Sequence, residues 1–166
     1  MQDAVEETLA WHGYGHYEVS AFARPGEECR HNLNYWLFGD YLGIGAGAHG
    51  KLSAPDGIRR QTRPRHPQAY LRAVEGGNAM EEAHAVAAAD LPFEFMMNAL
   101  RLTEGVPARL FAERTGLPPE TIRPQLEAAV ARGLLDVSAE RLAPTALGRR
   151  FLNDLLQLFL PERAEV

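Results

Sequence analysis

The second half of the chain carries a helical pattern of apolar residues that restricts its fold more than any other feature. From Ala83 onward the composition shifts to alanine, leucine and alternating charge. Helical spacing predicts helices over residues 89–103, 107–115, 119–132 and 145–159. Between the last two helices we expect short strands over 134–138 and 141–143, around a turn at Ala139-Glu140. Three helices, a hairpin and a closing helix form a mostly helical, winged-helix-like domain.

The first half mixes short helical and strand patterns. The expected elements are a helix over 3–12, a strand over 16–24, a strand over 58–63 after a Pro55-Asp56-Gly57 turn, and a helix over 67–75. The pair Gly76-Gly77 closes the last helix, so we expect two domains, residues 1–78 and 79–166. The mixture places the chain in the α+β or α/β class.

Charge and hydropathy narrow the partners that we expect. The chain of 166 residues has 46% hydrophobic residues and a formal net charge of −5, with no apolar run of about 20 residues. Residues 81–166 hold nine basic and 13 acidic side chains, whereas a helix that reads DNA arrives with surplus cations. We therefore expect a soluble cytoplasmic protein with no nucleic-acid partner and no membrane span.

The number of cysteines limits the disulfide and metal chemistry of the chain. Cys29 is the single cysteine of the chain. An intrachain disulfide needs two cysteines, and an iron–sulfur cluster needs about three or four thiolates. Neither is expected within this sequence.

Residues 31–36, His-Asn-Leu-Asn-Tyr-Trp, form the densest polar and aromatic cluster of the sequence. On a helix, His31 and Tyr35 lie four residues apart, as do Asn32 and Trp36. A neutral imidazole beside aromatic rings suits a flat, metal-bearing ligand, with His31 as the axial ligand. The same pattern also fits a helix cap followed by buried aromatic residues, and both interpretations stay open.

A glycine-alternating run follows the hexapeptide. On a strand, Gly43, Gly45 and Gly47 would share a face without side chains, which lets a ligand or another backbone approach closely, and His49 would stand at its edge. The run loosely satisfies the dinucleotide and phosphate-loop patterns, but no helix follows it and Leu52 replaces the required Ser or Thr. We therefore set both nucleotide interpretations aside.

Four segments carry a family resemblance: Tyr-Glu-Val-Ser at 17–20, Phe-Ala-Arg-Pro-Gly at 22–26, Cys-Arg-His-Asn-Leu-Asn-Tyr-Trp at 29–36 and the run from Gly39 to Lys51. Together they resemble the oxygen-independent coproporphyrinogen III oxidase-like radical S-adenosylmethionine (SAM) proteins, and within that family the haem chaperone branch. The resemblance implies that residues 1–78 are the tail of a partial (βα) barrel and that residues 79–166 are the C-terminal domain. The parent protein would hold a [4Fe-4S] cluster on a Cys-x-x-x-Cys-x-x-Cys motif that is absent from this chain.

The resemblance also implies site residues. His31, Asn32, Tyr35 and Trp36 match a His-Asn-x-x-Tyr-Trp signature associated with haem handling, whereas Leu33, Asn34 and His49 match positions that line the SAM site in related enzymes.

The resemblance further implies a function, which is binding of haem and its delivery to acceptor proteins. The alternatives are oxidative decarboxylation of coproporphyrinogen and, less consistent with the charge, a winged-helix nucleic-acid-binding module. Whether the parent is an enzyme stays open, and this chain alone is expected to be inactive because the cluster cysteines are missing. An unpaired edge of the truncated barrel would also favour a homodimer.

Overall fold

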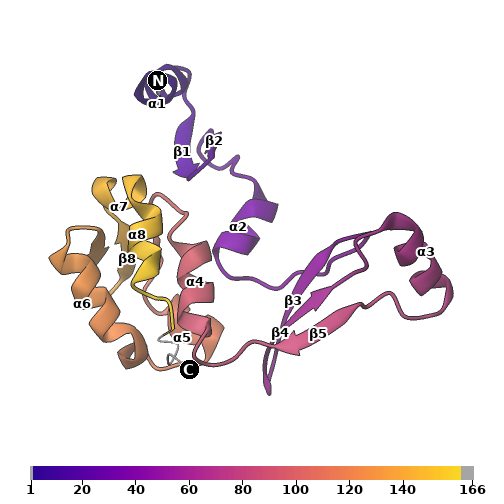
Figure 1. The fold of residues 1–166 in the computed structure, drawn as a ribbon. Coiled ribbons are helices and arrows are strands. Elements are labelled where there is room, and N and C mark those ends of the chain that lie inside the picture. Colours follow the sequence, from indigo (N-terminus) through magenta and orange to yellow (C-terminus); the bar gives the residue numbers. More distant parts are fainter. Residues whose placement is uncertain (1, 162–166) are drawn as a thin grey trace. The chain divides into compact units, whose positions relative to one another are not determined.

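A computed structural model describes residues 2–161 of the chain. The described residues form two compact units, one made of residues 2–38 and 89–161 and the other of Gly39–Ala88 (Figure 1). The boundaries of these units thus lie after Phe38 and after Ala88, and not at Gly76-Gly77. The assignment of residues 1–78 to the end of a barrel and of residues 79–166 to a C-terminal domain stays a prediction.

The first unit begins with the expected helix and then departs from the expected single strand. Its first elements are α1 (Gln2–Trp11), β1 (Gly15–Glu18), β2 (Ala21–Ala23) and α2 (Arg30–Trp36). The predicted strand over 16–24 is wrong, because β1 and β2 pair with each other as an antiparallel hairpin. The chain turns at Val19-Ser20, where the buried carboxylate of Glu18 accepts hydrogen bonds from the Ser20 amide (3.1 Å) and hydroxyl (2.9 Å).

The helical part of the first unit follows the predicted order. Its elements are α4 (Leu91–Ala99), β6 (Val106–Pro107), α5 (Leu110–Thr115), η1 (Pro119–Ile122), α6 (Arg123–Ala131), β7 (Leu135–Val137), β8 (Arg141–Pro144), α7 (Ala146–Arg150) and α8 (Leu152–Gln157). The predicted hairpin is confirmed as β7 and β8, and β6, which was not predicted, completes an antiparallel sheet of order β6-β8-β7.

Two predicted helices are shorter than expected. The helix predicted over 89–103 ends at Ala99, because the backbone of the next residues pairs with the first hairpin. Val19 N donates to Arg101 O at 3.0 Å, and Thr103 N donates to Tyr17 O at 3.1 Å. The closing helix is broken at Phe151, whose backbone (φ −114°, ψ 44°) is not helical.

Aromatic side chains form the centre of the core in the first unit. Phe95 is fully buried, with Phe38 at a ring-centroid distance of 5.6 Å on one side and Phe111 at 5.4 Å on the other, both edge-on. Only Leu37 separates Phe38 from the end of α2, so this aromatic stack fixes the C-terminal end of that helix. Met96, the neighbour of Phe95 in α4, is also fully buried.

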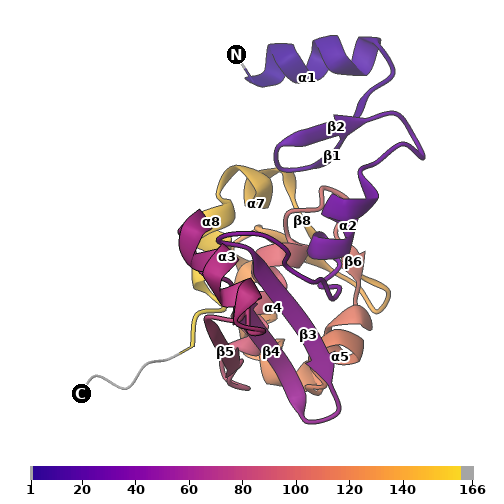
Figure 2. The same cartoon turned by 90° about the vertical axis from the view of Figure 1, so that its right-hand side faces the viewer.

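The second unit is an antiparallel sheet with one helix, shown by β3, β4, β5 and α3 in Figures 1 and 2. Its elements are β3 (His49–Ala54), β4 (Gly57–Thr62), α3 (Pro67–Glu75) and β5 (Glu82–Ala85). The structure confirms the predicted strand over 58–63, the turn before it and the helix over 67–75. The strands β3 and β5 were not predicted. Throughout residues 2–161 every strand pairing is antiparallel, and the mixed helix and sheet class is confirmed.

The single lysine of the chain is an unexpected core residue of the second unit. Lys51 is 1% exposed, and its Nζ donates to Asp40 Oδ1 (3.0 Å) and to Ser53 Oγ (3.3 Å). The Ser53 amide donates to Asp40 Oδ2 at 2.9 Å, and the Ser53 hydroxyl donates to Oδ1 at 2.8 Å. A buried ammonium is stable only with such partners, so Asp40 and Ser53 keep Lys51 inside the sheet.

This arrangement predicts a pH-dependent contribution to stability. Burial raises the pKa of Asp40, but the hydrogen bonds from Ser53 and Lys51 and the lysine charge outweigh it, so the pKa of the carboxyl lies below its ordinary 3.8. The stabilisation is therefore present above the unfolded-state pKa and is lost as the pH falls through the folded-state pKa. Asp40→Asn should lower the free energy of unfolding at pH 7 by about 1 kcal/mol, since the carboxylate is partly exposed and screened. Urea unfolding from pH 7 to pH 3 should show that difference shrinking below about pH 4.

The neighbouring hairpin turn supplies the control for this measurement. Asp56, which pairs with Arg59 across the exposed turn, has a side chain that is 61% exposed. Asp56→Asn should leave both the stability and its pH dependence nearly unchanged. Equal pH profiles for Asp40→Asn and the unsubstituted chain would show that the carboxylate contributes nothing.

Among residues 2–161, no helix is both long and apolar enough to cross a bilayer.

Candidate functional site

Helix α2 carries the polar and aromatic hexapeptide. The helix begins after Cys29, whose carbonyl accepts from Leu33 N at 2.9 Å, and no side chain caps its first turn. It ends at Trp36 with Leu37 as the C-cap, and Phe38 follows with a left-handed backbone (φ 55°) that directs its ring into the core. The predicted helix is confirmed, whereas the predicted cap before it is absent.

His31 and Tyr35 meet on one face of α2. Their rings are edge-on, with centroids 4.6 Å apart and planes at 86°. The imidazole of His31 is exposed, and among residues 2–161 it has no hydrogen-bond partner. One nitrogen of a neutral imidazole has a lone pair that can coordinate a metal, so this side chain is free to act as a ligand.

The neighbouring stripe of α2 turns toward the protein. Asn32 Nδ2 donates to Tyr17 Oη at 3.3 Å, and Trp36 lies beside Arg101 with the guanidinium carbon 4.3 Å from the ring centroid. The remaining two residues, Leu33 and Asn34, are half-buried and exposed, respectively. The hexapeptide therefore presents His31 and half of Tyr35 outward while Asn32 and Trp36 attach the helix to the unit. The interpretation as a helix cap followed by buried aromatic residues is wrong, because no side chain caps α2 and none of its residues is buried. The interpretation as a ligand site stays a prediction.

The glycine run is a loop, and the prediction of a strand with a bare face is wrong. Gly45 and Gly47 have left-handed backbone (φ 106° and 70°), which a strand does not allow. A Cβ on Gly43 would lie 2.2 Å from the carbonyl oxygen of His49, so the close approach that this glycine permits is to the chain's own backbone. His49 is not the edge of a smooth face, since it begins β3 opposite Thr62.

Hydrogen bonds fix this loop to the rest of the second unit. Gly45 N donates to Tyr70 Oη at 3.2 Å, and Gly47 N donates to Pro64 O at 2.9 Å. Arg63 donates twice, from its backbone N to Ala48 O at 2.9 Å and from Nε to Gly43 O at 3.2 Å. The loop thus joins α3 to the end of β4.

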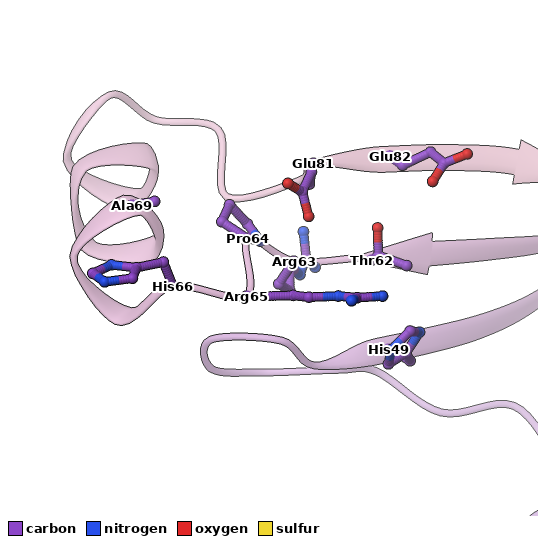
Figure 3. A pocket seen from close by; sticks show the side chains of 9 residues that line it. All are labelled: His49, Thr62, Arg63, Pro64, Arg65, His66, Ala69, Glu81 and Glu82. Atoms are coloured by element: carbon purple, nitrogen blue, oxygen red, sulfur yellow. The ribbon is translucent and has the colours of Figure 1, made fainter.

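A polar pocket of about 500 Å³ opens beside this loop, within the second unit (Figure 3). It is lined by His49, Thr62, Arg63, Pro64, Arg65, His66, Ala69, Glu81 and Glu82. Figure 3 shows the Arg63 side chain directed toward the side of Glu81, while Arg65 extends toward His49. The lining carries charges of both signs, which suits a polar ligand.

Of the pocket residues only His49 was predicted as a site residue. The others lie at the end of β4, in the link to α3, in the first turn of α3 and around the start of β5. No site was predicted in these segments. The run Arg63-Pro64-Arg65-His66 concentrates basic side chains at a strand end, and this was the available signal.

The predicted site residues fall into two separate groups. Residues 31–36 belong to the first unit, whereas Gly43, Gly45, Gly47 and His49 belong to the second. Neither unit taken by itself contains both groups. Within residues 2–161, no three His, Cys, Asp or Glu side chains gather as a metal site, and Cys29 is exposed.

Comparisons with known proteins point to one family. A model of the HemN C-terminal domain matches residues 86–151. The heme chaperone HemW of Escherichia coli is 51% identical over 151 residues, which cover 90% of this chain and 39% of that protein. The Haemophilus influenzae heme chaperone HemW is 45% identical, over 94% of this chain and 40% of its own length.

A solved structure shows a similar fold. The coproporphyrinogen III oxidase HemN from Escherichia coli, described as a radical SAM enzyme, superposes with a TM-score of 0.67 at 18% identity. The match covers 95% of this chain and 39% of the HemN chain. At this identity the likeness concerns the fold alone. This chain therefore spans about two fifths of the length of the proteins that it matches.

Proposed function

We propose that this protein binds haem and delivers it to acceptor proteins, on the premise that the chain belongs to the radical SAM family that includes HemN and the heme chaperones HemW. Its HemN C-terminal domain and its similarity to relatives named heme chaperone HemW support the proposal. Because the chain spans about two fifths of those relatives, haem transfer is proposed for the whole protein and haem binding for this chain.

The observation that carries the proposal is the free imidazole of His31. Haem, when bound, would supply an iron that accepts a nitrogen ligand. His31 fits this requirement because it is exposed, lacks a hydrogen-bond partner among residues 2–161, and stands edge-on to Tyr35. Tyr35 would limit rotation of the imidazole and offer an apolar surface to a flat macrocycle.

The other hexapeptide residues would act through the position of α2. Asn32 connects the helix to Tyr17, and Trp36 connects it to Arg101. We propose the two as residues that orient the haem site, in agreement with the signature that includes them.

A SAM site is proposed for the parent protein on family grounds. Leu33 and Asn34 in the first unit are candidate contributors to that site. The same holds for His49, Gly43, Gly45 and Gly47 in the second unit. The [4Fe-4S] cluster does not fit this chain, since one cysteine cannot replace three or four thiolates. No step of the proposal for this chain depends on the cluster.

Titration of ferric haem into the chain tests the proposal. The unsubstituted chain should give a saturable change in the Soret band. His31→Ala should weaken binding by roughly 100-fold or more, because removal of a group that only hydrogen-bonds to a metal ligand already costs about 10–100-fold. His12→Ala is the matched control, because His12 is also an exposed histidine at a helix. Identical titrations for His31→Ala and His12→Ala would remove His31 as the ligand.

Oxidative decarboxylation of coproporphyrinogen is the second candidate, favoured by the fold shared with HemN. The full-length protein, reconstituted anaerobically with its cluster and SAM, separates the two functions. Product formation would support the oxidase, whereas haem binding without product supports the chaperone. We also propose a cytoplasmic location, and a homodimer through a free sheet edge, for which β5 is a candidate because all four of its residues are exposed.

The comparisons give no support to the nucleic-acid alternative. The charges around α6 are balanced: Arg123, its first residue, pairs with Glu120 at 3.5 Å, and Glu127 lies within the helix. This balance agrees with the charge argument from the sequence.

A further inference from the structure

Arg101 lies where three distant parts of the first unit meet. It follows α4 and belongs to the segment that matches the HemN C-terminal domain. Its Nη2 donates to Glu18 Oε2 on β1 at 3.1 Å, and its guanidinium carbon lies 4.3 Å from the centroid of the Trp36 ring on α2. One side chain therefore contacts the first hairpin and the end of the hexapeptide.

The guanidinium is held in a fixed orientation. Glu18 is 2% exposed, and its second oxygen, Oε1, already accepts from the Ser20 amide and hydroxyl. A buried carboxylate requires a charged or hydrogen-bonding partner for each oxygen, so Glu18 holds Arg101 strongly. The backbone is held as well, because the Arg101 carbonyl accepts from Val19 N at 3.0 Å.

The contact with Trp36 is partly desolvated. The indole Nε1 of Trp36 and the Nε of Arg101 are both buried, and neither has a hydrogen-bond partner among residues 2–161. The Trp36 indole therefore makes its polar contact through its ring face, with the Arg101 guanidinium. In such an environment a cation–π contact is stronger than at an exposed surface.

A continuous series of contacts leads from this pair to the imidazole. The rings of Trp36 and Tyr35 have centroids 6.3 Å apart, and those of Tyr35 and His31 are 4.6 Å apart. We propose that Arg101 is a positioning residue that fixes Trp36, and through Tyr35 sets the orientation of His31. The C-terminal domain would thereby hold the haem motif in place. The link to haem rests on the function proposed above, whereas the positioning of Trp36 by Arg101 does not.

The two tryptophans allow a direct test in the full chain. Trp11 is 88% exposed, so Trp11→Phe leaves Trp36 as the single indole at little structural cost. In this background, Arg101→Lys keeps the positive charge but loses the planar group that stacks on the ring. We expect the near-ultraviolet circular dichroism of Trp36 to fall and its emission to shift, with unchanged far-ultraviolet spectra. Haem binding should weaken roughly 2- to 30-fold, the fold-change that corresponds to a cation–π contact.

Two further variants keep the test decisive. Arg109→Lys is the matched control, because Arg109 also pairs with a glutamate but its side chain is 71% exposed. Glu18→Gln is the second variant, in which the arginine stays but loses its charged anchor, and it should change the Trp36 signal in the same direction. If Arg101→Lys and Glu18→Gln both leave the Trp36 spectra like those of Arg109→Lys, the positioning role is wrong. A changed indole signal in a chain that binds no haem would support the positioning of Trp36 and contradict the proposed function instead.

Discussion

Replacing Phe95 with alanine will destabilise the first unit by about 3–5 kcal/mol. Phe95 is fully buried and has an edge-on aromatic ring on each side, Phe38 and Phe111. The substitution removes two aromatic contacts and leaves a cavity that the flanking rings cannot fill, because each is held by its own element. Urea unfolding followed by tryptophan fluorescence measures the loss, since both tryptophans, Trp11 and Trp36, belong to this unit.

The same substitution should also disturb the haem motif. Phe38 fixes the C-terminal end of α2, so loss of its partner releases the helix that carries His31. Phe151→Ala is the matched control, because Phe151 is 46% exposed and should cost less than about 1 kcal/mol. If Phe95→Ala and Phe151→Ala unfold at the same urea concentration, the aromatic stack does not hold the core together.

Gly43→Ala should destabilise the second unit by roughly 2–4 kcal/mol. The backbone of Gly43 is not left-handed, so the cost comes from the new Cβ, which would lie 2.2 Å from the carbonyl oxygen of His49. Relief of that clash requires the loop to move away from β3. Hydrogen exchange measures the effect, through faster exchange of the amides in His49–Ala54 and Gly57–Thr62.

A second glycine separates the clash from backbone strain. Gly57 has φ 130° but open space around its Cβ position, so Gly57→Ala tests strain without a clash and should cost about 1 kcal/mol. If Gly43→Ala exchanges like the unsubstituted chain, the close approach of the loop to His49 is not a constraint on folding.

Elements with strong local signals could be predicted from the sequence. The α3 helix starts at a proline and ends at two glycines, and the β7–β8 hairpin alternates around a polar turn; both are found at the predicted places. The α2 helix was also predicted, from its i, i+4 pattern. In each case the residues that define the element lie close together in the sequence.

Elements that depend on distant partners could not be predicted. The strand β3 contains Lys51, a residue that normally faces solvent, and its burial depends on Asp40 eleven positions earlier. The glycine run alternates as a strand does, but the tertiary contacts of its backbone with Pro64 and Tyr70 close it into a loop. The first hairpin depends on a buried Glu18, which needs Arg101, 83 positions later in the sequence.

The candidate site shows the same division. The contact of His31 with Tyr35 followed from helical spacing, and the structure confirms it. The contact of Trp36 with Arg101 joins residues 65 positions apart, and the pocket beside His49 collects side chains from several segments. Neither carries a local pattern that the sequence alone reveals.

A ligand exchange at position 31 tests the central claim most directly. His31→Cys offers ferric haem a thiolate where the chain has an imidazole, and the two ligands give different electron paramagnetic resonance spectra. We predict a nitrogen-ligated spectrum for the unsubstituted chain, a thiolate-ligated spectrum for His31→Cys in a Cys29→Ser background, and neither signal for His31→Ala. If all three chains give the same haem spectrum, His31 does not ligate the iron.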